Sequence, residues 1–472
     1  MSVTNPLQMV ASARTIGALS RNPPRPTSAK RTRLLGIAAL FAGHAVLGVA
    51  MGDYTVIATV HAVVCALAGV VYAATTRQLR NIPIVVAYVA GSEVLWRMDR
   101  ANVFYEFGKY LVAAILLVAL LRIQARRNRA LAILYFALLV PSVIMTFVTL
   151  EPTPARQETA FTMSGPLTIA IAIIFFSNIR LDAEKMRRCY VALIAPVAGI
   201  AAVLLVSTAR SEAIDFGNAS NYVTSGGFGP NQVSSMLGLA ALFLVLLSFD
   251  RNLGLGVRGA ALALATLFAG QSALPFARGG VGLALAAVLG AIFVLVRGSR
   301  RARLTVVIVA VLGIAIGKLV VEPRLDRLTQ GKLAERYSST KTSGRELFIS
   351  SELEMFAEHP FIGVGPGVGK EIRDQRGLHA GPSHTEYTRM IAEHGLLGLG
   401  SLICLVVLAV RGIRQTSEPS YRAVSTAFLI WTGMFLMVYG IRLAAPAVVL
   451  GLMFANRPPS PRPRTLGDAR AR

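Results

Sequence analysis

The sequence is short of charged residues and of cysteine. Only 15% of its 472 residues are charged, whereas 54% are hydrophobic, and the mean hydropathy is +0.58. A soluble chain of this length would carry more charge, so the composition excludes an ordinary soluble protein. The three cysteines, Cys65, Cys189 and Cys404, all lie inside or beside apolar runs. We interpret them as small buried apolar residues, and we expect neither a disulfide framework nor a cysteine metal site.

Long apolar runs make up much of the sequence. Many are about 16 to 22 residues long, enough to cross or nearly cross a bilayer core. The pattern predicts an all-α, polytopic integral membrane protein with about 12–14 transmembrane helices and a large extracytoplasmic loop that contains short helices. Fourteen candidate spans begin near residues 34, 55, 82, 108, 130, 162, 189, 231, 256, 279, 304, 396, 423 and 441.

The runs divide the chain into five parts. Residues 1–33 are basic and proline-rich, lack the apolar region of a signal peptide, and are expected to be a disordered cytoplasmic tail. Residues 34–321 hold predicted transmembrane helices 1–11, and 322–395 form the large outer loop. Residues 396–455 hold predicted helices 12–14, and 456–472 form a second basic cytoplasmic tail.

Acidic residues are few, 24 against 48 basic ones. If the N-terminal tail is cytoplasmic and the spans alternate, the two tails and the inner links hold 30 of the basic residues and 5 of the acidic ones. Such a bias is the positive-inside rule. It explains the net charge of +24 without a nucleic-acid partner and predicts contact with anionic membrane lipids.

The large loop contains two helix starts of the Ser-x-x-Glu capping-box type. "SGRE", from Ser343, predicts a helix that carries Arg345 in its first turn and ends near Glu358 before His-Pro. "SHTE", which includes His384 and Glu386, predicts a second helix over residues 384–394. Gly395 suits the position just after that helix.

Helix starts of this kind favour anions, and an arginine adds a forked cation that suits phosphate. A neutral imidazole at His384 could accept a proton. The alternative is that His384 is only a polar residue of the first turn. Arg278, in "FARGGVG", begins a span at the outer side and is a second candidate anion site, or else an interfacial arginine. Arg210, in the preceding outer link, is a weaker candidate of the same kind.

Two other kinds of site are absent from the pattern. "HPFIGVGPGVGK" lacks the spacing of a phosphate-binding P-loop, and we interpret it as a tight glycine turn that lets the backbone approach the membrane surface. The loop carboxylates Glu352 and Glu354 diverge on a helix, and its histidines lack a ligand spacing. We therefore expect no metal and no cofactor.

The loop resembles that of the O-antigen ligase family. His384-Thr385, nine residues, Gly395, two residues and Gly398 fit the family's histidine pattern, except that Thr385 replaces the usual Asn, Ser or Gln. "GRELFISSELEMFAEHPFIGVGPG" is similar to its segment of arginine, helix and glycine turn. The resemblance covers roughly residues 220–455.

Two span starts extend the likeness. "FARGGVGLAL" resembles the family's Ser-Arg-Gly start, with Ala277 in place of serine. "GFGPNQVSSML" resembles its Asn-Pro-Asn start, with Gly229 in place of the first asparagine and Asn231 retained.

The resemblance implies a metal-independent glycosyltransferase at the outer face of the bacterial cytoplasmic membrane. The implied donor is a glycan on undecaprenyl diphosphate, and the acceptor is a hydroxyl of lipid A-core, another glycan or a protein. The family's base falls on His384, and its diphosphate-binding arginines fall on Arg278 and Arg345. A ligase and a polysaccharide polymerase both fit. A lipid-linked oligosaccharide flippase and a noncatalytic export scaffold remain as alternatives from other classes.

Overall fold

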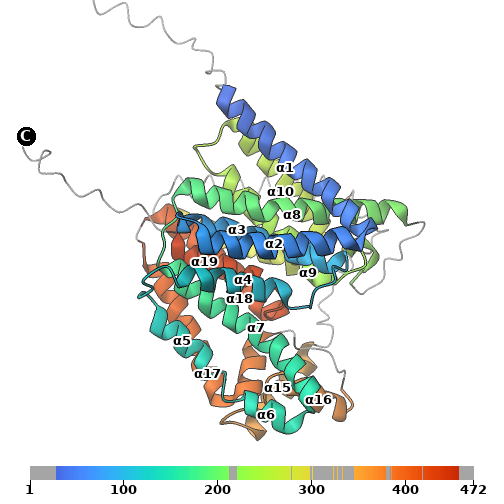
Figure 1. Ribbon diagram of the computed structural model, residues 1–472, viewed down its shortest axis with the longest axis vertical. Coiled ribbons are helices and arrows are strands. Elements are labelled where there is room, and N and C mark those ends of the chain that lie inside the picture. The colour runs from blue at the N-terminus through green and yellow to red at the C-terminus, as the bar shows by residue number, and fades with distance from the viewer. Residues whose placement is uncertain are drawn as a thin grey trace, which may run out of the picture.

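Figure 1 shows the computed structural model of the chain. The structure describes residues 28–211, 220–277, 279–297, 345–378, 383, 385–416 and 418–456, together with single residues between 300 and 332. The span expected near residue 304 and most of the first part of the large loop therefore lie outside the described residues, as do residues 1–27 and 457–472 of the two tails. Residues 28–33, which were expected to belong to the first tail, are helical.

The described residues form helices joined by turns, with a single isolated bridge between Leu181 and Asn456. The all-α, polytopic class is confirmed. The α-helices are α1 (Ser28–Asp53), α2 (Thr55–Thr75), α3 (Ile82–Met98), α4 (Phe107–Leu120), α5 (Arg129–Ala137), α6 (Val143–Thr149), α7 (Pro152–Ser177), α8 (Ala183–Arg210), α9 (Pro230–Ser248), α10 (Leu255–Ala273), α11 (Gly279–Val296), α15 (Arg345–Glu358), α16 (Val368–Gln375), α17 (Glu386–Arg414), α18 (Pro419–Tyr439) and α19 (Ala445–Ala455).

Eight of these helices are long and apolar enough to cross a membrane: α1, α2, α7, α8, α9, α11, α17 and α18. Each coincides with an expected span. The other expected spans in the described part of the chain coincide with α3, α4, α5, α10 and α19, which are shorter or less apolar. Helix α19 is short because the non-helical turn 440–444 separates it from α18 within one apolar stretch.

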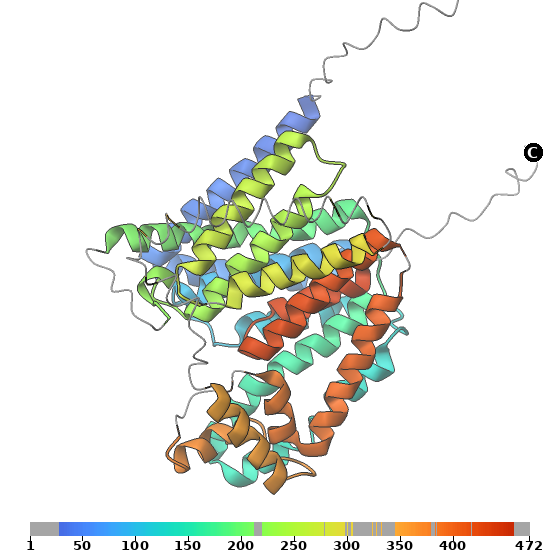
Figure 2. The same cartoon turned by 180° about the vertical axis from the view of Figure 1, so that it is seen from behind.

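Helix α19 lies at the centre of the bundle. All of its 11 residues are buried, and it packs against α7, α18 and α3. A helix that is apolar on every side is expected in such a place. Behind it in the view of Figure 1, and in front in Figure 2, α11 lies against α18 and α9. A Cβ on Gly238 of α9 would come within 2.2 Å of the Gly280 carbonyl oxygen, so glycines let these helices touch backbone to backbone.

Four of the basic links that were expected to face the cytoplasm lie on one side of the bundle. Lys185 donates to Asn81, which joins the link after α2 to the start of α8. The Asn178 side chain accepts from the backbone amides of Arg126 and Arg127, which joins the link after α4 to the end of α7. A pocket joins Arg127 to the end of α17. This arrangement agrees with the alternation that the charge pattern predicts.

The described part of the large loop forms a unit at the opposite end from α1 (Figure 1). We call α6, α15, α16 and residues 386–395 of α17, with the turns between them, the loop unit. It has a small core of its own, in which Met355, Val364, Val368 and Ala392 pack together. The helix expected to end near Glu358 is α15, whereas α16 was not predicted.

The glycine turn between α15 and α16 has the expected sharp geometry. Gly363, Gly365 and Gly367 all have positive φ, where glycine alone is unstrained. The turn also contacts α17 through its backbone. The amides of Val364 and Gly365 donate to the carbonyls of Ala392 and Glu393, each at 3.0 Å. It therefore fixes α16 against α17.

Candidate functional site

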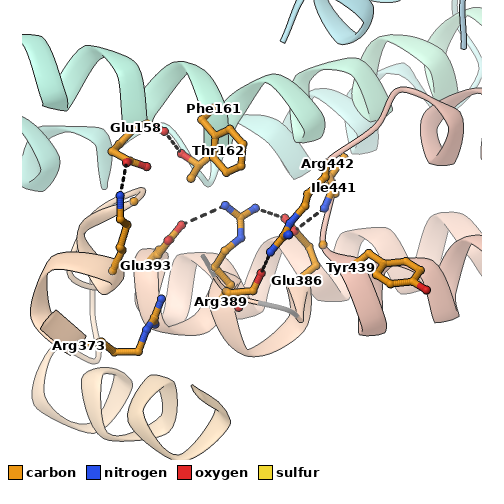
Figure 3. Close-up of a pocket in the computed structure, with 14 residues that line it drawn as sticks. Glu158, Phe161, Thr162, Arg373, Glu386, Arg389, Glu393, Tyr439, Ile441 and Arg442 are labelled. Atoms are coloured by element: carbon orange, nitrogen blue, oxygen red, sulfur yellow. Dashed lines mark hydrogen bonds and ion pairs between the residues drawn. The ribbon is translucent and has the colours of Figure 1, made fainter. Parts of the chain in front are cut away.

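A polar pocket lies where the loop unit meets the helix bundle. Its empty volume is about 470 Å³. Its wall combines four cations and three carboxylates from α7, α16, α17 and the turn after α18, as Figure 3 shows for most of them. The lining residues are Glu158, Phe161, Thr162, Gly367, Lys370, Arg373, Ser383, Glu386, Arg389, Glu393, Tyr439, Gly440, Ile441 and Arg442.

Arg389 lies in the middle of this wall, between two carboxylates of its own helix (Figure 3). It pairs with Glu386 one turn before it and with Glu393 one turn after it, the latter at 3.5 Å. The side chains of all three are mostly or fully buried, and both carboxylates share the one guanidinium that lies between them. A spacing of three and four residues places the three groups on one helix face.

The turn 440–444 between α18 and α19 is held by charged side chains at its backbone. Glu386 accepts from the Ile441 amide at 3.0 Å, and Glu93 accepts from the Ala444 amide at 2.7 Å. Arg97 donates to the Arg442 carbonyl at 2.9 Å, and the Lys109 ammonium lies 3.5 Å from the Ile441 carbonyl. Unwound backbone within a helix bundle needs such partners, because the helix no longer supplies them.

These contacts bring Arg442 into the pocket. Its guanidinium donates to the Ser383 carbonyl at 2.8 Å, which links the turn to the segment just before α17. Glu93 in turn accepts from Arg97 at 2.6 Å. The cation at Arg442 is thus positioned by residues of α3 and α4, far from it in sequence.

A second ion pair supports the loop unit. Arg373 of α16 lies 3.6 Å from Glu352 of α15 and stacks over the Phe348 ring at 4.9 Å. Burial raises the pKa of Glu352, although hydrogen bonds from Ser383 and Thr388 oppose that shift. Burial likewise lowers the pKa of Arg373, against the attraction of Glu352. Glu352 is thereby connected to the residue that precedes His384.

Three predicted site groups fall outside the described parts of the chain: residues His384 and Arg278, and the side chain of Arg345. The described neighbours of His384 and Arg278 lie near the pocket. Ser383 is part of its wall, and Gly279 packs so closely against Tyr439 that a Cβ would lie 1.8 Å from the phenol oxygen. Arg345 is the first residue of α15, as expected.

The capping-box prediction at Ser383 is wrong in its details. Helix α17 begins at Glu386 and its N-cap is Thr385, so His384 precedes the helix instead of lying in its first turn. The Glu386 carboxylate does not turn back to the helix start. It bonds Arg389 and the Ile441 amide, because these cationic and amide donors converge on it within the buried wall.

Gly395 and Gly398 form the kink of α17. Gly395 has φ 60° and ψ −142°, a conformation that side chains rarely adopt, and it interrupts the helix. A Cβ on Gly398 would lie 2.0 Å from the Met390 carbonyl oxygen. The two glycines of the histidine pattern therefore set the direction of residues 386–394 relative to the apolar part of α17.

Arg210 and Asn231 do not line the pocket. Arg210 pairs with Asp53 at 2.8 Å, and both side chains are exposed, so the pair joins α8 to the end of α1. Asn231 lies half-buried in the first turn of α9. Its neighbour Gln232 accepts from Arg97 at 2.8 Å and thereby supports the 440–444 turn.

Sequence reasoning missed Arg389, Glu393, Arg373 and Arg442. The one available signal for the first two was their spacing with Glu386, at i, i+3 and i+7, on a helix that had been singled out for its histidine. No comparable signal marks Arg442, because its partners lie on α3, α4 and before α17.

Comparison with known families agrees with the resemblance. Residues 259–403 match the family model described as O-antigen ligase. This segment is therefore similar to the O-antigen ligase family. Among curated proteins, no match to the chain is found. The O-antigen ligase segment includes α15, α16 and the beginning of α17, and it therefore supplies five of the seven charged residues that line the pocket.

The carboxylates of the pocket are engaged with arginine, lysine or backbone amides. Within the described ranges, no group of three or more His, Cys, Asp or Glu residues is placed to hold a metal ion.

Proposed function

We propose that this protein, whose residues 259–403 are similar to the O-antigen ligase family, is a glycosyltransferase of surface polysaccharide biosynthesis. It transfers a glycan from undecaprenyl diphosphate to an acceptor hydroxyl at the outer face of the bacterial cytoplasmic membrane. Both termini face the cytoplasm and the loop unit faces outward. The acceptor is lipid A-core in the ligase form of the proposal and another glycan in the polymerase form, with a protein hydroxyl as a third possibility.

The pocket wall is the observation that carries the proposal. Lys370, Arg373, Arg389 and Arg442 converge there, and Ser383 brings the wall next to His384 in sequence. A diphosphate carries two or more negative charges, and forked guanidinium groups suit its oxygens. The match over residues 259–403 supports transfer over the transporter alternative.

The proposed reaction is a direct displacement. His384 takes the proton of the acceptor hydroxyl while that oxygen forms a bond to the anomeric carbon of the donor. The bond from that carbon to the diphosphate oxygen breaks, and undecaprenyl diphosphate leaves with the electron pair. Arg278, Arg345 and Arg442 stabilise the developing charge, as an electrostatic substitute for a metal ion. Direct attack inverts the anomeric centre, so a product that retains the donor configuration would refute this mechanism.

The decisive experiment compares the wild type with His384→Ala. Both are purified, supplied with an undecaprenyl-diphosphate glycan and candidate acceptors, and assayed in EDTA for transferred glycan and released undecaprenyl diphosphate. We expect the wild type to act in EDTA and the variant to lose at least about 100-fold, the usual scale of a lost general base. His359→Ala, an exposed histidine of the same loop, is the matched control. Equal transfer by His384→Ala would return His384 to a structural role.

The acceptor that becomes labelled separates a ligase from a polymerase. Label on lipid A-core indicates a ligase, whereas glycan chains that lengthen on undecaprenyl diphosphate indicate a polymerase. If the wild type releases no undecaprenyl diphosphate with any acceptor, the transferase proposal fails. A transport assay on the same lipid would then test the flippase alternative.

A further inference from the structure

The end of α17 that lies away from the candidate site carries a mixed apolar and basic stripe. Val407, Val410, Arg411 and Arg414 follow each other at i, i+3, i+4 and i+7, so they share one helix face. The valines are substantially exposed, Val410 by 42%, and they belong to a helix that is long and apolar enough to cross a membrane. The stripe therefore changes from apolar to cationic where the helix leaves the membrane.

A groove accompanies this stripe. It has an empty volume of about 900 Å³ and adds Arg127 and Asn128, from the link before α5, to the valines and arginines of α17. Three of its described lining residues are arginines and none is a carboxylate. In the part of the chain that the structure describes, no ion pair includes Arg127, Arg411 or Arg414.

Basic residues continue beyond the groove. The Asn178 side chain bonds the backbone of Arg127 and also lines a neighbouring polar pocket of about 1330 Å³. That pocket contains Arg77, Arg80 and Lys185, again without a carboxylate among its described lining residues. Burial and the nearby positive charge of Arg180 lower the pKa of Arg127. An anion between these groups would relieve their mutual repulsion.

We propose that this groove binds an anionic phospholipid of the membrane leaflet that surrounds the basic end of α17. Its phosphate lies between Arg127, Arg411 and Arg414, and an acyl chain lies along Val406 and Val410. The charges of the groove and the lipid are complementary, because three cations surround one phosphate. The apolar parts also correspond, because the valines lie on the part of α17 that continues into the bilayer, where the acyl chain lies. The site is separate from the proposed transfer site, so the two proposals can fail independently.

Native mass spectrometry of the purified full chain tests the proposal. Phosphatidylglycerol is titrated against wild type and against R411Q/R414Q, with phosphatidylcholine as the zwitterionic comparison. We expect the variant to bind phosphatidylglycerol about 30-fold more weakly, roughly fivefold for each arginine removed, and phosphatidylcholine to bind weakly to both. The matched control is R251Q/R297Q, which removes two exposed arginines from other basic links and should bind as wild type does.

A third variant and a soluble competitor separate lipid binding from binding of a small anion. R127Q, on a separate link, should weaken the binding of phosphatidylglycerol about fivefold. It replaces the double variant in the test if that variant does not fold. Glycerol 3-phosphate should not displace the lipid, and displacement would indicate a soluble-anion site instead. Equal loss in R251Q/R297Q, equal binding of the two lipids, or unchanged binding in the groove variants would overturn the proposal.

Discussion

At the scale of the residue, Arg442 is the pocket cation whose place depends most on distant parts of the chain. We predict that Arg442→Ala lowers transfer about 10- to 100-fold, because a charge-assisted hydrogen bond to a phosphate oxygen would be lost. Arg442→Lys should recover part of this loss, since it restores the charge without the fork. The measurement is the initial rate of transfer at several donor concentrations.

The control for Arg442 is Arg376→Ala. Arg376 follows α16 in the loop unit, and its side chain pairs with the exposed carboxylates Glu354 and Glu358. Exposed pairs contribute little, so its removal should leave transfer nearly unchanged. A similar loss in both variants would mean that Arg442 acts through general folding of the loop unit.

At the scale of the element, the kink of α17 depends on one glycine. We predict that Gly395→Ala destabilises the protein by about 1–3 kcal/mol, because φ 60° with ψ −142° is accessible to glycine almost alone. Thermal unfolding in detergent would report the change. Gly400→Ala is the control on the same helix. Its new Cβ would meet only the Leu138 side chain at 3.3 Å, and we expect a shift below about 1 kcal/mol.

The turn 440–444 is the second element with a specific requirement. Glu93→Ala would leave the Arg97 guanidinium without its carboxylate and the Ala444 amide without its acceptor. Breaking a buried pair in this way costs about 3–5 kcal/mol. Glu184→Ala removes an exposed pair with Arg188 and should cost less than about 1 kcal/mol. Comparable unfolding temperatures for the two variants would contradict the role assigned to Glu93.

At the scale of the whole molecule, the prediction concerns orientation. In a chain whose three native cysteines are replaced, Ser350→Cys on α15 should react with a membrane-impermeant maleimide in intact spheroplasts. Gln78→Cys, in the basic link after α2, should react only after the membrane is opened. Both positions are exposed, so access depends on the side of the membrane. The reverse pattern would invert the topology and place the pocket in the cytoplasm.

The sequence by itself determined the class, most helix positions and the family segment. Apolar runs can be recognised in the local sequence. In a bilayer such a run forms a helix, because its backbone polar groups must bond to each other in the absence of water. Local glycines were equally informative: Gly395 was expected at a helix end, and it forms the kink. The local sequence does not decide which apolar residues of α15 are buried: Leu353 is 47% exposed, whereas Met355 is buried.

Only the tertiary structure decided which charges share the pocket. Arg389 and Arg442 are 53 positions apart, and Arg97, which donates to the Arg442 carbonyl, lies 345 positions before it. A buried charge is stable only beside its partners, and these partners meet through helix packing instead of through sequence spacing. The same reason explains Arg210, whose sequence context suggested an anion site but whose guanidinium meets Asp53 once α1 and α8 are packed together.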